Sequence, residues 1–337
     1  MNRCELIFTL RLAISYHKSV YRMGGKTMEI VRPRESAEFR ARDSLLEKTL
    51  RSDGVPFPIA SEYPLVLAEE GALYSYCLKE SGDTVAHANL WPRQLVNARG
   101  RPVLKVGLVG NVATSPQWQG RGFCRYLLQN LEKTAKSLDI KAIVLWSDLS
   151  QFYQNLGFTS PGGEWRLTFP AASQWSERPA GSDDFVLVDA SSLSNTDLQE
   201  MLDLRYPVPL TLRRSVEEYR RLLTIPATAV FMLFRGNRIA AYCITGKGVD
   251  MAGVVHEWGA DDPEVLAGGI ATISRFLGDV PVTLLLPEKS RLNWKPVLAR
   301  RAADCEKHPM AWVRFLTTDR RVRDVLGSSF IWGLDSI

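Results

Sequence analysis

Hydrophobic positions along the chain follow two different periods, and the order of these periods predicts a mixed α/β protein. Apolar side chains recur at helical spacing over 36–50 and most clearly over 123–138, where Phe123, Leu127 and Leu131 share one face. Short apolar runs typical of strands separate these helices. We predict strands within 63–79 and at 84–90, 103–113 and 142–146, and a short helix over 150–156 that ends at Gly157.

A second set of elements in much the same order follows a polar, proline-bearing segment at 173–184, which we interpret as a linker. The pattern predicts strands at 185–188, 229–235, 239–245, 253–258 and 282–286, helices at 193–204, 263–277 and 294–301, and a closing strand at 311–316. This recurrence predicts an internal repeat at domain length. We therefore expect a first domain over 28–172, a second over 185–318, and a tail over 319–337 that is docked on the body, since its last ten residues are strongly apolar.

The first 27 residues do not fit this plan. Their apolar stretch at 6–14 is interrupted by Arg11 and is too short to span a bilayer, and no small-residue cleavage site follows it. An apolar strand pattern opens at Met28. We expect residues 1–27 to be an N-terminal extension or Met28 to be the functional start, with an amphipathic surface anchor as the alternative.

Composition limits the class of protein. The chain has 337 residues, 45% of them hydrophobic and 23% charged, which is ordinary for globular domains. Its net charge of +5 suits anionic ligands, but no nucleic-acid reader motif accompanies it, so we expect no nucleic acid partner. The five cysteines are scattered without a CxxC pair, and His256-Glu257 lacks the second histidine of an HExxH motif. We therefore expect no metal site, no membrane span and a reducing, cytoplasmic location.

The segment from Val112 to Phe123 carries the chemistry. It is predicted to pass from the end of a strand through a glycine-punctuated turn, with Gly120 and Gly122, into the first turn of a helix. Such a turn directs free backbone N–H groups toward one point, which favours an anion such as a phosphate.

This segment resembles a known family. Gln117–Gly122 (QWQGRG) fits the (Q/R)xxGx(G/A) acetyl-CoA motif of the GNAT N-acyltransferase superfamily, and 149–158 (LSQFYQNLGF) is similar to the family's FYxxLGF signature. The two motifs stand in the family's order, joined by a helix and a strand. The resemblance implies an α/β (α+β) fold of two tandem GNAT-like domains, each with a mixed, mostly antiparallel sheet flanked by helices.

The resemblance also implies how the cofactor is held. The backbone of Val112, Ala113 and Thr114 would pair with the pantetheine arm where two strands splay apart. Backbone N–H groups of the turn and the helix start would hold the pyrophosphate, with glycine allowing close approach. The implied cofactor-binding residues are Val112, Ala113, Thr114, Gln117, Gln119, Gly120, Arg121, Gly122, Phe123 and Cys124. Trp118 is expected either to cover the cofactor or to pack on a neighbouring strand.

Tyr153 matches the family's general acid, which protonates the departing CoA thiolate. Relatives often have Asn and Ala where this chain has Trp146 and Leu149, so the local CoA contacts depart from the pattern. No general base is evident on the strand 105–113. The open candidates are His87, Asp148 and a water held by backbone carbonyls, and in some tandem relatives the chain's own C-terminal carboxylate reaches the site, which here directs attention to Ile337.

The second half departs further from the family. At the equivalent loop it has Asp261, Asp262 and Glu264, whose carboxylates would repel a pyrophosphate and cap their own helix. We expect a degenerate domain that does not bind CoA, with a Glu257-dependent second activity as the alternative.

These features predict an acyltransferase: an N-acetyltransferase that moves the acetyl group of acetyl-CoA to a primary amine in a ternary complex, without a metal. The alternatives are a non-catalytic acyl-CoA-binding regulatory protein and a transferase of a larger acyl or aminoacyl group. The acceptor loops carry no motif, so the sequence selects neither the amine nor the oligomeric state.

Overall fold

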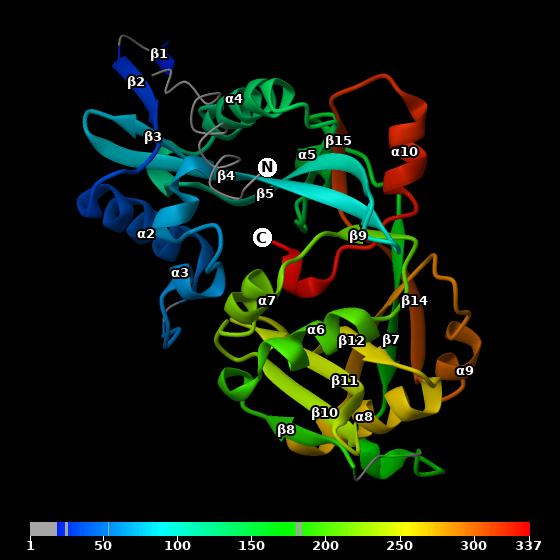
Figure 1. The fold of residues 1–337 in the computed structure, drawn as a ribbon. Coiled ribbons are helices and arrows are strands. Elements are labelled where there is room, and N and C mark those ends of the chain that lie inside the picture. The colour runs from blue at the N-terminus through cyan, green and yellow to red at the C-terminus, as the bar shows by residue number, and fades with distance from the viewer. Residues whose placement is uncertain (1–18, 24–25, 53, 180, 182–183) are drawn as a thin grey trace.

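The computed structural model describes residues 19–23, 26–52, 54–179, 181 and 184–337 (Figure 1). The first half contains strands β1 (Ser19–Met23), β2 (Lys26–Val31), β3 (Ser75–Glu80), β4 (Asp83–Asn97), β5 (Pro102–Thr114), β6 (Ala142–Leu145) and β7 (Gly163–Phe169). Its helices are α2 (Ser36–Leu50), α3 (Ile59–Glu62), α4 (Phe123–Ser137) and α5 (Ser150–Gln154), with short 3-10 helices η1 (Glu69–Tyr74), η2 (Pro116–Trp118) and η3 (Ala172–Gln174).

The second half contains strands β8 (Val186–Val188), β9 (Leu210–Leu212), β10 (Ala229–Arg235), β11 (Arg238–Lys247), β12 (Asp250–Ala260), β13 (Val282–Pro287), β14 (Asp304–Pro309) and β15 (Trp312–Phe315). Its helices are α6 (Asn195–Leu204), α7 (Val216–Leu222), α8 (Pro263–Phe276), α9 (Lys295–Ala299) and α10 (Arg320–Leu326), with η4 (Ala190–Ser192) and η5 (Gly333–Asp335). Residues 1–18, the greater part of the predicted N-terminal extension, lie outside the described residues. Ser19–Met23 forms a hairpin with β2, which begins two residues before Met28.

The strands form two mixed sheets with the same local plan. The first has the order β1-β2-β3-β4-β5-β6-β15, with β9 added on β4, and the second has β14-β7-β13-β12-β11-β10-β8. Neighbouring strands run antiparallel except at β5·β6 and β12·β13, which are parallel. A helix crosses over between the two strands of each parallel pair, α4 in the first sheet and α8 in the second. This arrangement confirms the predicted mixed, mostly antiparallel sheets, and the two sheets fit the predicted tandem repeat.

The two sheets exchange a strand. β7 precedes the predicted linker yet lies between β13 and β14 of the second sheet, where Leu167 stands opposite both Leu284 and Cys305. In return β15 pairs with β6 of the first sheet, where Val313 stands opposite Val144. The strand at 311–316 was predicted to close the second half, and this was wrong: it closes the first sheet. The ranges 28–172 and 185–318 remain a prediction, but neither range holds one complete sheet.

Local sequence explains most elements. α4 buries the stripe of Phe123, Leu127, Leu131 and Ala135 against the first sheet, as the helical period predicted. The predictions were less accurate between α2 and β3, where α3 and η1 occupy most of 59–74 and the strand begins only at Ser75. The apolar side chains of Ile59 and Leu67 there pack in a small buried cluster with Leu46 and Ala113, and their spacing is that of short helical turns and not of a strand.

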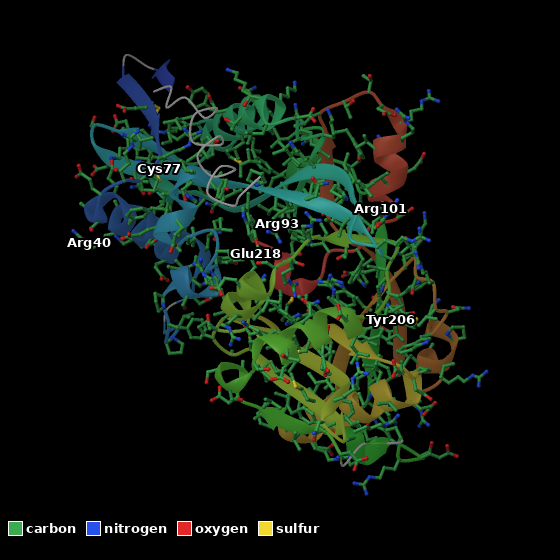
Figure 2. All side chains as sticks on the ribbon, in the orientation of Figure 1. Arg40, Cys77, Arg93, Arg101, Tyr206 and Glu218 are labelled. Atoms are coloured by element: carbon green, nitrogen blue, oxygen red, sulfur yellow. The ribbon has the colours of Figure 1, made fainter. Side chains whose placement is uncertain are left out.

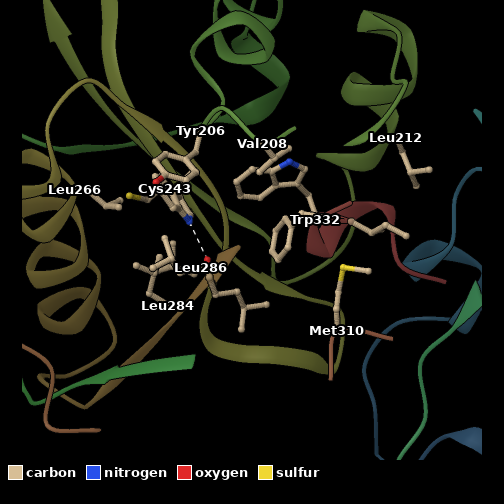
Figure 3. Close-up of a cluster of buried hydrophobic side chains, with 14 of the residues drawn as sticks. Tyr206, Val208, Leu212, Cys243, Leu266, Leu284, Leu286, Met310 and Trp332 are labelled. Carbon is tan, nitrogen blue, oxygen red and sulfur yellow. Dashed lines mark hydrogen bonds between the residues drawn. The ribbon is translucent and has the colours of Figure 1, made fainter. Parts of the chain in front are cut away.

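One apolar core crosses both halves. Trp91 and Leu108 of the first sheet belong to the same buried cluster as Trp258 of the second sheet and Trp332 of the C-terminal segment. Trp332 has no exposed surface and packs edge-on against Phe330 and Trp258, with ring centroids 5.0 Å and 6.0 Å away. Figure 3 shows Trp332 within this cluster, beside Val208. The two sheets share this core, and each contains one strand from the other half of the chain. We therefore expect them to unfold together.

Trp332→Ala should therefore destabilise the whole protein rather than its C-terminal end. Removing so large a buried side chain is expected to lower the free energy of unfolding by about 3–5 kcal/mol. Urea denaturation followed by far-ultraviolet circular dichroism and by tryptophan fluorescence should show one transition, moved to lower urea. Leu292→Ala, at a site where the side chain is 41% exposed, is the control and should change the midpoint little. Two separate transitions, with only one shifted, would contradict a shared core.

Candidate active site

The loop between β5 and α4 leaves free space at the start of α4. Gly120 and Gly122 have φ angles of 75° and 78°, in the left-handed region that glycine accepts readily, and a Cβ at either position would meet no atom within 4 Å. Gly122 is the N-cap of α4, and no side chain caps this helix or adds an acidic group to its first turn. The positive end of the helix dipole therefore faces outward with its N–H groups available to an anion.

Side chains of the loop reinforce its shape. The Gln119 amide donates a hydrogen bond to the Thr114 carbonyl oxygen at 3.2 Å, which closes the turn after β5. The Arg121 guanidinium lies 4.5 Å from the ring centre of Trp118, and that ring lies 5.8 Å from the ring of Phe123. Trp118 also packs, partly buried, against the hydrophobic cluster of the first sheet, and it keeps the Arg121 cation beside the open helix end.

β5 separates from β6 just before this loop. Their parallel pairing runs through Val106, Gly107 and Leu108 and ends at Leu108↔Val144. β5 continues to Thr114, and Trp312 of β15 donates a hydrogen bond to Ser147 O at 3.0 Å, just beyond the end of β6. Val112, Ala113 and Thr114 therefore lie on the part of β5 that has left β6, where an extended ligand has main-chain groups to pair with.

A bulge marks the same place on the other side of β5. Asn89 of β4 stands opposite Gly110, whereas His87 stands opposite Ala113, so β5 has one more residue than β4 over this interval. Asn111 adopts the left-handed backbone conformation at this bulge, with a φ of 49°. Bulges of this kind re-aim backbone and side chains next to functional sites.

Tyr153 of α5 packs beside the start of α4. Its ring lies edge-on to Phe152 and Phe158, with centroids 5.1 Å and 5.5 Å away. Burial raises the pKa of Tyr153, and the neighbouring Cys124 thiol raises it further. Burial also raises the pKa of Cys124 to about 11. Near neutral pH, Tyr153 is therefore a protonated phenol, able to donate a hydrogen bond close to the open helix end.

Several polar side-chain atoms around the bulge have no hydrogen-bond partner among the described residues. His87 Nδ1 lies 2.8 Å from Asn111 O; because a carbonyl oxygen only accepts, Nδ1 carries the proton and Nε2 keeps its lone pair. Burial lowers the pKa of His87 to about 3. Within the described part of the chain, His87 Nε2, Asn89 Oδ1 and the side-chain amide of Asn111 have no hydrogen-bond partner. These buried atoms form an environment that suits a polar ligand or water.

The C-terminal segment reaches the same face of β5. A Cβ at Gly110 would stand 2.3 Å from the main-chain carbonyl carbon of Ile337 and 2.5 Å from its oxygen. Figure 1 shows the red segment ending between the two sheets. Position 110 therefore requires glycine for close approach, and the main chain of Ile337 lies next to the bulge.

The structure thus arranges the predicted site residues into two groups. The predicted cofactor residues follow one another from the end of β5 through the loop to the first turn of α4, with Ala113 and Phe123 buried, and Tyr153 lies next to Cys124. Of the base candidates, Asp148 is exposed on the loop after β6, His87 is fully buried under the bulge, and Ile337 abuts Gly110. Gly110, Asn89 and Asn111 were missed. An isolated glycine in an otherwise apolar strand was the signal for such a close approach.

The corresponding loop of the second half is closed. The Asp262 carboxylate accepts a hydrogen bond from Glu264 N at 2.7 Å and caps α8, while the Glu264 carboxylate pairs with Arg301 at 2.7 Å. Glu257 is fully buried and forms two hydrogen bonds with Arg214. Among the described residues, no group of three or more His, Cys, Asp or Glu side chains is placed to hold a metal. Nor does the described part of the chain contain a helix both long and apolar enough to cross a bilayer.

Comparisons with known proteins agree with this geometry. Residues 42–158 match the model of the acetyltransferase (GNAT) family, a range that contains β4, β5, the loop, α4 and Tyr153. No curated protein matches the sequence at a significant level.

Solved structures share the fold over most of the chain. A GCN5-related N-acetyltransferase from Kribbella flavida is 16% identical, with a TM-score of 0.59 over 86% of this chain and 72% of its own. A probable N-acyltransferase from Enterococcus faecalis is 15% identical, with a TM-score of 0.64 over 86% and 73%. The N-myristoyltransferase of Saccharomyces cerevisiae, solved with myristoyl-CoA, is 10% identical, with a TM-score of 0.54 over 90% and 86%. At such identities the likeness concerns the fold, whereas the match over residues 42–158 shows that this part of the chain belongs to the acetyltransferase (GNAT) family.

Proposed function

We propose that the protein is an N-acetyltransferase that transfers the acetyl group of acetyl-CoA to a primary amine. The observation that carries this proposal is the uncapped start of α4 behind Gly120 and Gly122, which follows a strand that has left its neighbour. Membership of residues 42–158 in an acyl-CoA-dependent transferase family supports it.

The pyrophosphate of CoA would bind at the loop. Backbone N–H groups from Gln119 to Cys124 would donate to its oxygens, and Arg121 would add a charge-assisted hydrogen bond. The second half lacks this capacity because Asp262 already occupies the start of α8. We therefore assign cofactor binding to the first half alone. Val112, Ala113 and Thr114 would pair with the pantetheine arm, which directs the thioester toward the bulge.

The reaction would be a direct attack in a ternary complex. The neutral amine attacks the thioester carbonyl carbon, a tetrahedral intermediate forms, and the C–S bond breaks to release CoA thiolate. Tyr153 would donate its phenolic hydrogen bond to this sulfur. The proton lost by the amine would pass to a water held by oxygen atoms on the face of β5 that meets Ile337. His87 is too weak a base to receive this proton, because its pKa is about 3.

Gly120→Glu should abolish tight acetyl-CoA binding. The new carboxylate would stand where the pyrophosphate is expected, and its charge would repel the ligand. The dissociation constant measured by calorimetry should rise by about 100-fold or more, which corresponds to about 2.7 kcal/mol.

Gly100→Glu is the matched control for this variant. Gly100 also has a positive φ, of 70°, and open space around its Cβ position, but it lies in the β4–β5 turn. The two substitutions therefore carry similar backbone strain, and only the first should weaken binding. Equal affinity in both variants would remove the loop from the cofactor site.

Tyr153→Phe should lower kcat by about 100-fold while leaving the acetyl-CoA dissociation constant within about twofold, since the phenol acts on the leaving sulfur rather than on the phosphates. Tyr206→Phe is the control and should leave kcat unchanged. It also removes a phenolic hydroxyl from a buried tyrosine, but this hydroxyl donates to Leu292 O in the second half. Unchanged turnover in Tyr153→Phe would exclude the phenol from the reaction.

The amine acceptor is best found by screening primary amines, polyamines and peptide N-termini with acetyl-CoA, with release of free CoA thiol as the readout. An active pair would support the proposed reaction. Tight acetyl-CoA binding with no thiol release across the panel would instead favour a regulatory acyl-CoA-binding protein, and release only from longer acyl-CoA thioesters would favour a transferase of larger groups.

A further inference from the structure

The C-terminal segment is held between the halves before it reaches β5. Phe330 N donates to Leu210 O at 2.9 Å, which aligns the segment with β9. Trp332 and Leu334 are fully buried, and η5 follows at Gly333–Asp335. The segment therefore enters the region under β5 along a fixed course.

A buried guanidinium fixes the middle of this segment. Arg214 forms two hydrogen bonds with Glu257 of β12, at 2.8 and 2.9 Å, and two with Asp335, at 3.2 and 2.8 Å. Burial would lower the pKa of Arg214, but Asp335 and Glu257 together hold it well above its ordinary value. Arg93 of β4 adds a cation 3.9 Å from Asp335. Figure 2 shows Arg93 above the C-terminal segment, with Glu218 next to Arg93. These two side chains form an ion pair.

A buried lysine fixes the end of the segment. Lys247, at the end of β11, donates to Gly333 O at 2.9 Å, to Ser336 Oγ at 2.8 Å, and to Ser336 O. An ammonium group has three hydrogens, so these three acceptors use all of its donors. Lys247 belongs to the second sheet, whereas the residue after Ser336 abuts Gly110 of the first sheet.

Two glycines fit the segment to its surroundings. A Cβ at Gly333 would stand 2.6 Å from the His256 side chain of β12, and a Cβ at Gly110 would stand 2.3 Å from Ile337. The segment is thus enclosed on the side of the second sheet and on the side of β5. Any shift in residues 333–336 would move Ile337 relative to the bulge.

We propose that Lys247 is a positioning residue that, together with Arg214, holds residues 333–337 so that the main chain of Ile337 forms part of the acceptor side of the acyl-transfer site. The second half thereby takes part in the reaction without binding CoA. This inference rests on the proposed function for its effect on turnover, whereas the holding of the segment itself is independent of that function.

The hydrogen bonds from Lys247 to residues 333 and 336, which we call the clamp, should depend on pH. Lys247 faces Asp250, Asp335, Glu62, Arg214, His256 and the ring of Tyr63. Burial lowers its pKa to about 8, even though Asp250 and Asp335 oppose this shift. All three hydrogen bonds are present below that pH, and one is lost when the ammonium group becomes a neutral amine above it. Turnover should therefore decline as pH rises through about 8, and this decline should be absent in a variant without the amine.

The test uses Lys247→Met, which keeps an unbranched side chain, one atom shorter, and has no donor. Hydrogen exchange measured by mass spectrometry on the full chain should show faster exchange over 329–337, with unchanged exchange in α4. With an active amine pair, kcat should fall by about tenfold or more and the KM for acetyl-CoA should stay within about twofold, because the cofactor loop is unaltered. The fall above pH 8 should disappear.

Gly110→Ala approaches the same contact from the other side. The added methyl group meets main-chain atoms of Ile337, so kcat should fall without a change in the KM for acetyl-CoA, and the double variant with Lys247→Met should lose little more than either single variant. Gly107→Ala is the matched control: it lies on the same strand, but its Cβ would meet the flexible Leu90 side chain on the opposite face. Lys295→Met, a second-half lysine over the Trp165 ring, controls for loss of charge.

The outcomes separate the two proposals. Unchanged hydrogen exchange over 329–337 in Lys247→Met would overturn the clamp, whatever the effect of the substitution on kcat. Faster exchange with unaltered kcat and pH profile, in a protein whose wild type is active, would show that the held segment has no part in the reaction and would also overturn the proposal. A wild type that releases no thiol would instead overturn the proposed function, and the exchange result would still decide whether Lys247 holds the segment. If Lys247→Met fails to fold, Gly110→Ala with its Gly107→Ala control decides the proposal through exchange and kcat.

Discussion

The structure depends on one buried charge arrangement, the Arg214 guanidinium between the carboxylates of Glu257 and Asp335. None of these side chains has exposed area, so each would carry a large desolvation cost if its partners were removed. The arrangement joins the loop before α7, β12 and η5, three segments that are far apart in the chain. Apolar packing brings such segments together but leaves their register loose, whereas paired hydrogen bonds fix it. The course of the C-terminal segment follows from this constraint.

The strand exchange gives the same constraint a topological form. The first sheet, which carries the glycine loop between β5 and α4, is closed by β15 from the second half, and the second sheet contains β7 from the first half. The Trp332 core then fills the space between them. The second half, whose helix α8 is capped by Asp262, is therefore built into the same body as the first sheet and is not a separate module.

The sequence predicted what is encoded locally. The helix at 123–137, the strand before it, the glycine loop and Tyr153 were all recognisable because period and turn chemistry act over a few residues. The partner of β15 was not, because an apolar run at 312–315 fits an edge of either sheet equally well. Ile337 was among the open candidates, but the glycine that it meets, Gly110, and the contacts of Lys247 with the C-terminal segment were missed for a related reason: each joins residues far apart in the chain. Their sequence signals, a glycine within a strand and a lysine at a strand end, are common in proteins generally.

The pairing of Val144 with Val313 also bears on how the chain is made. During synthesis the glycine loop and α4 leave the ribosome long before β15 exists, so β6 must wait with an unpaired edge. Such a late, long-range contact slows folding and exposes an aggregation-prone strand in the interval. It also means that a prematurely terminated chain, even one with a complete glycine loop, cannot close the sheet that carries this loop. The topology thus makes synthesis of nearly the whole chain a condition for assembling the site.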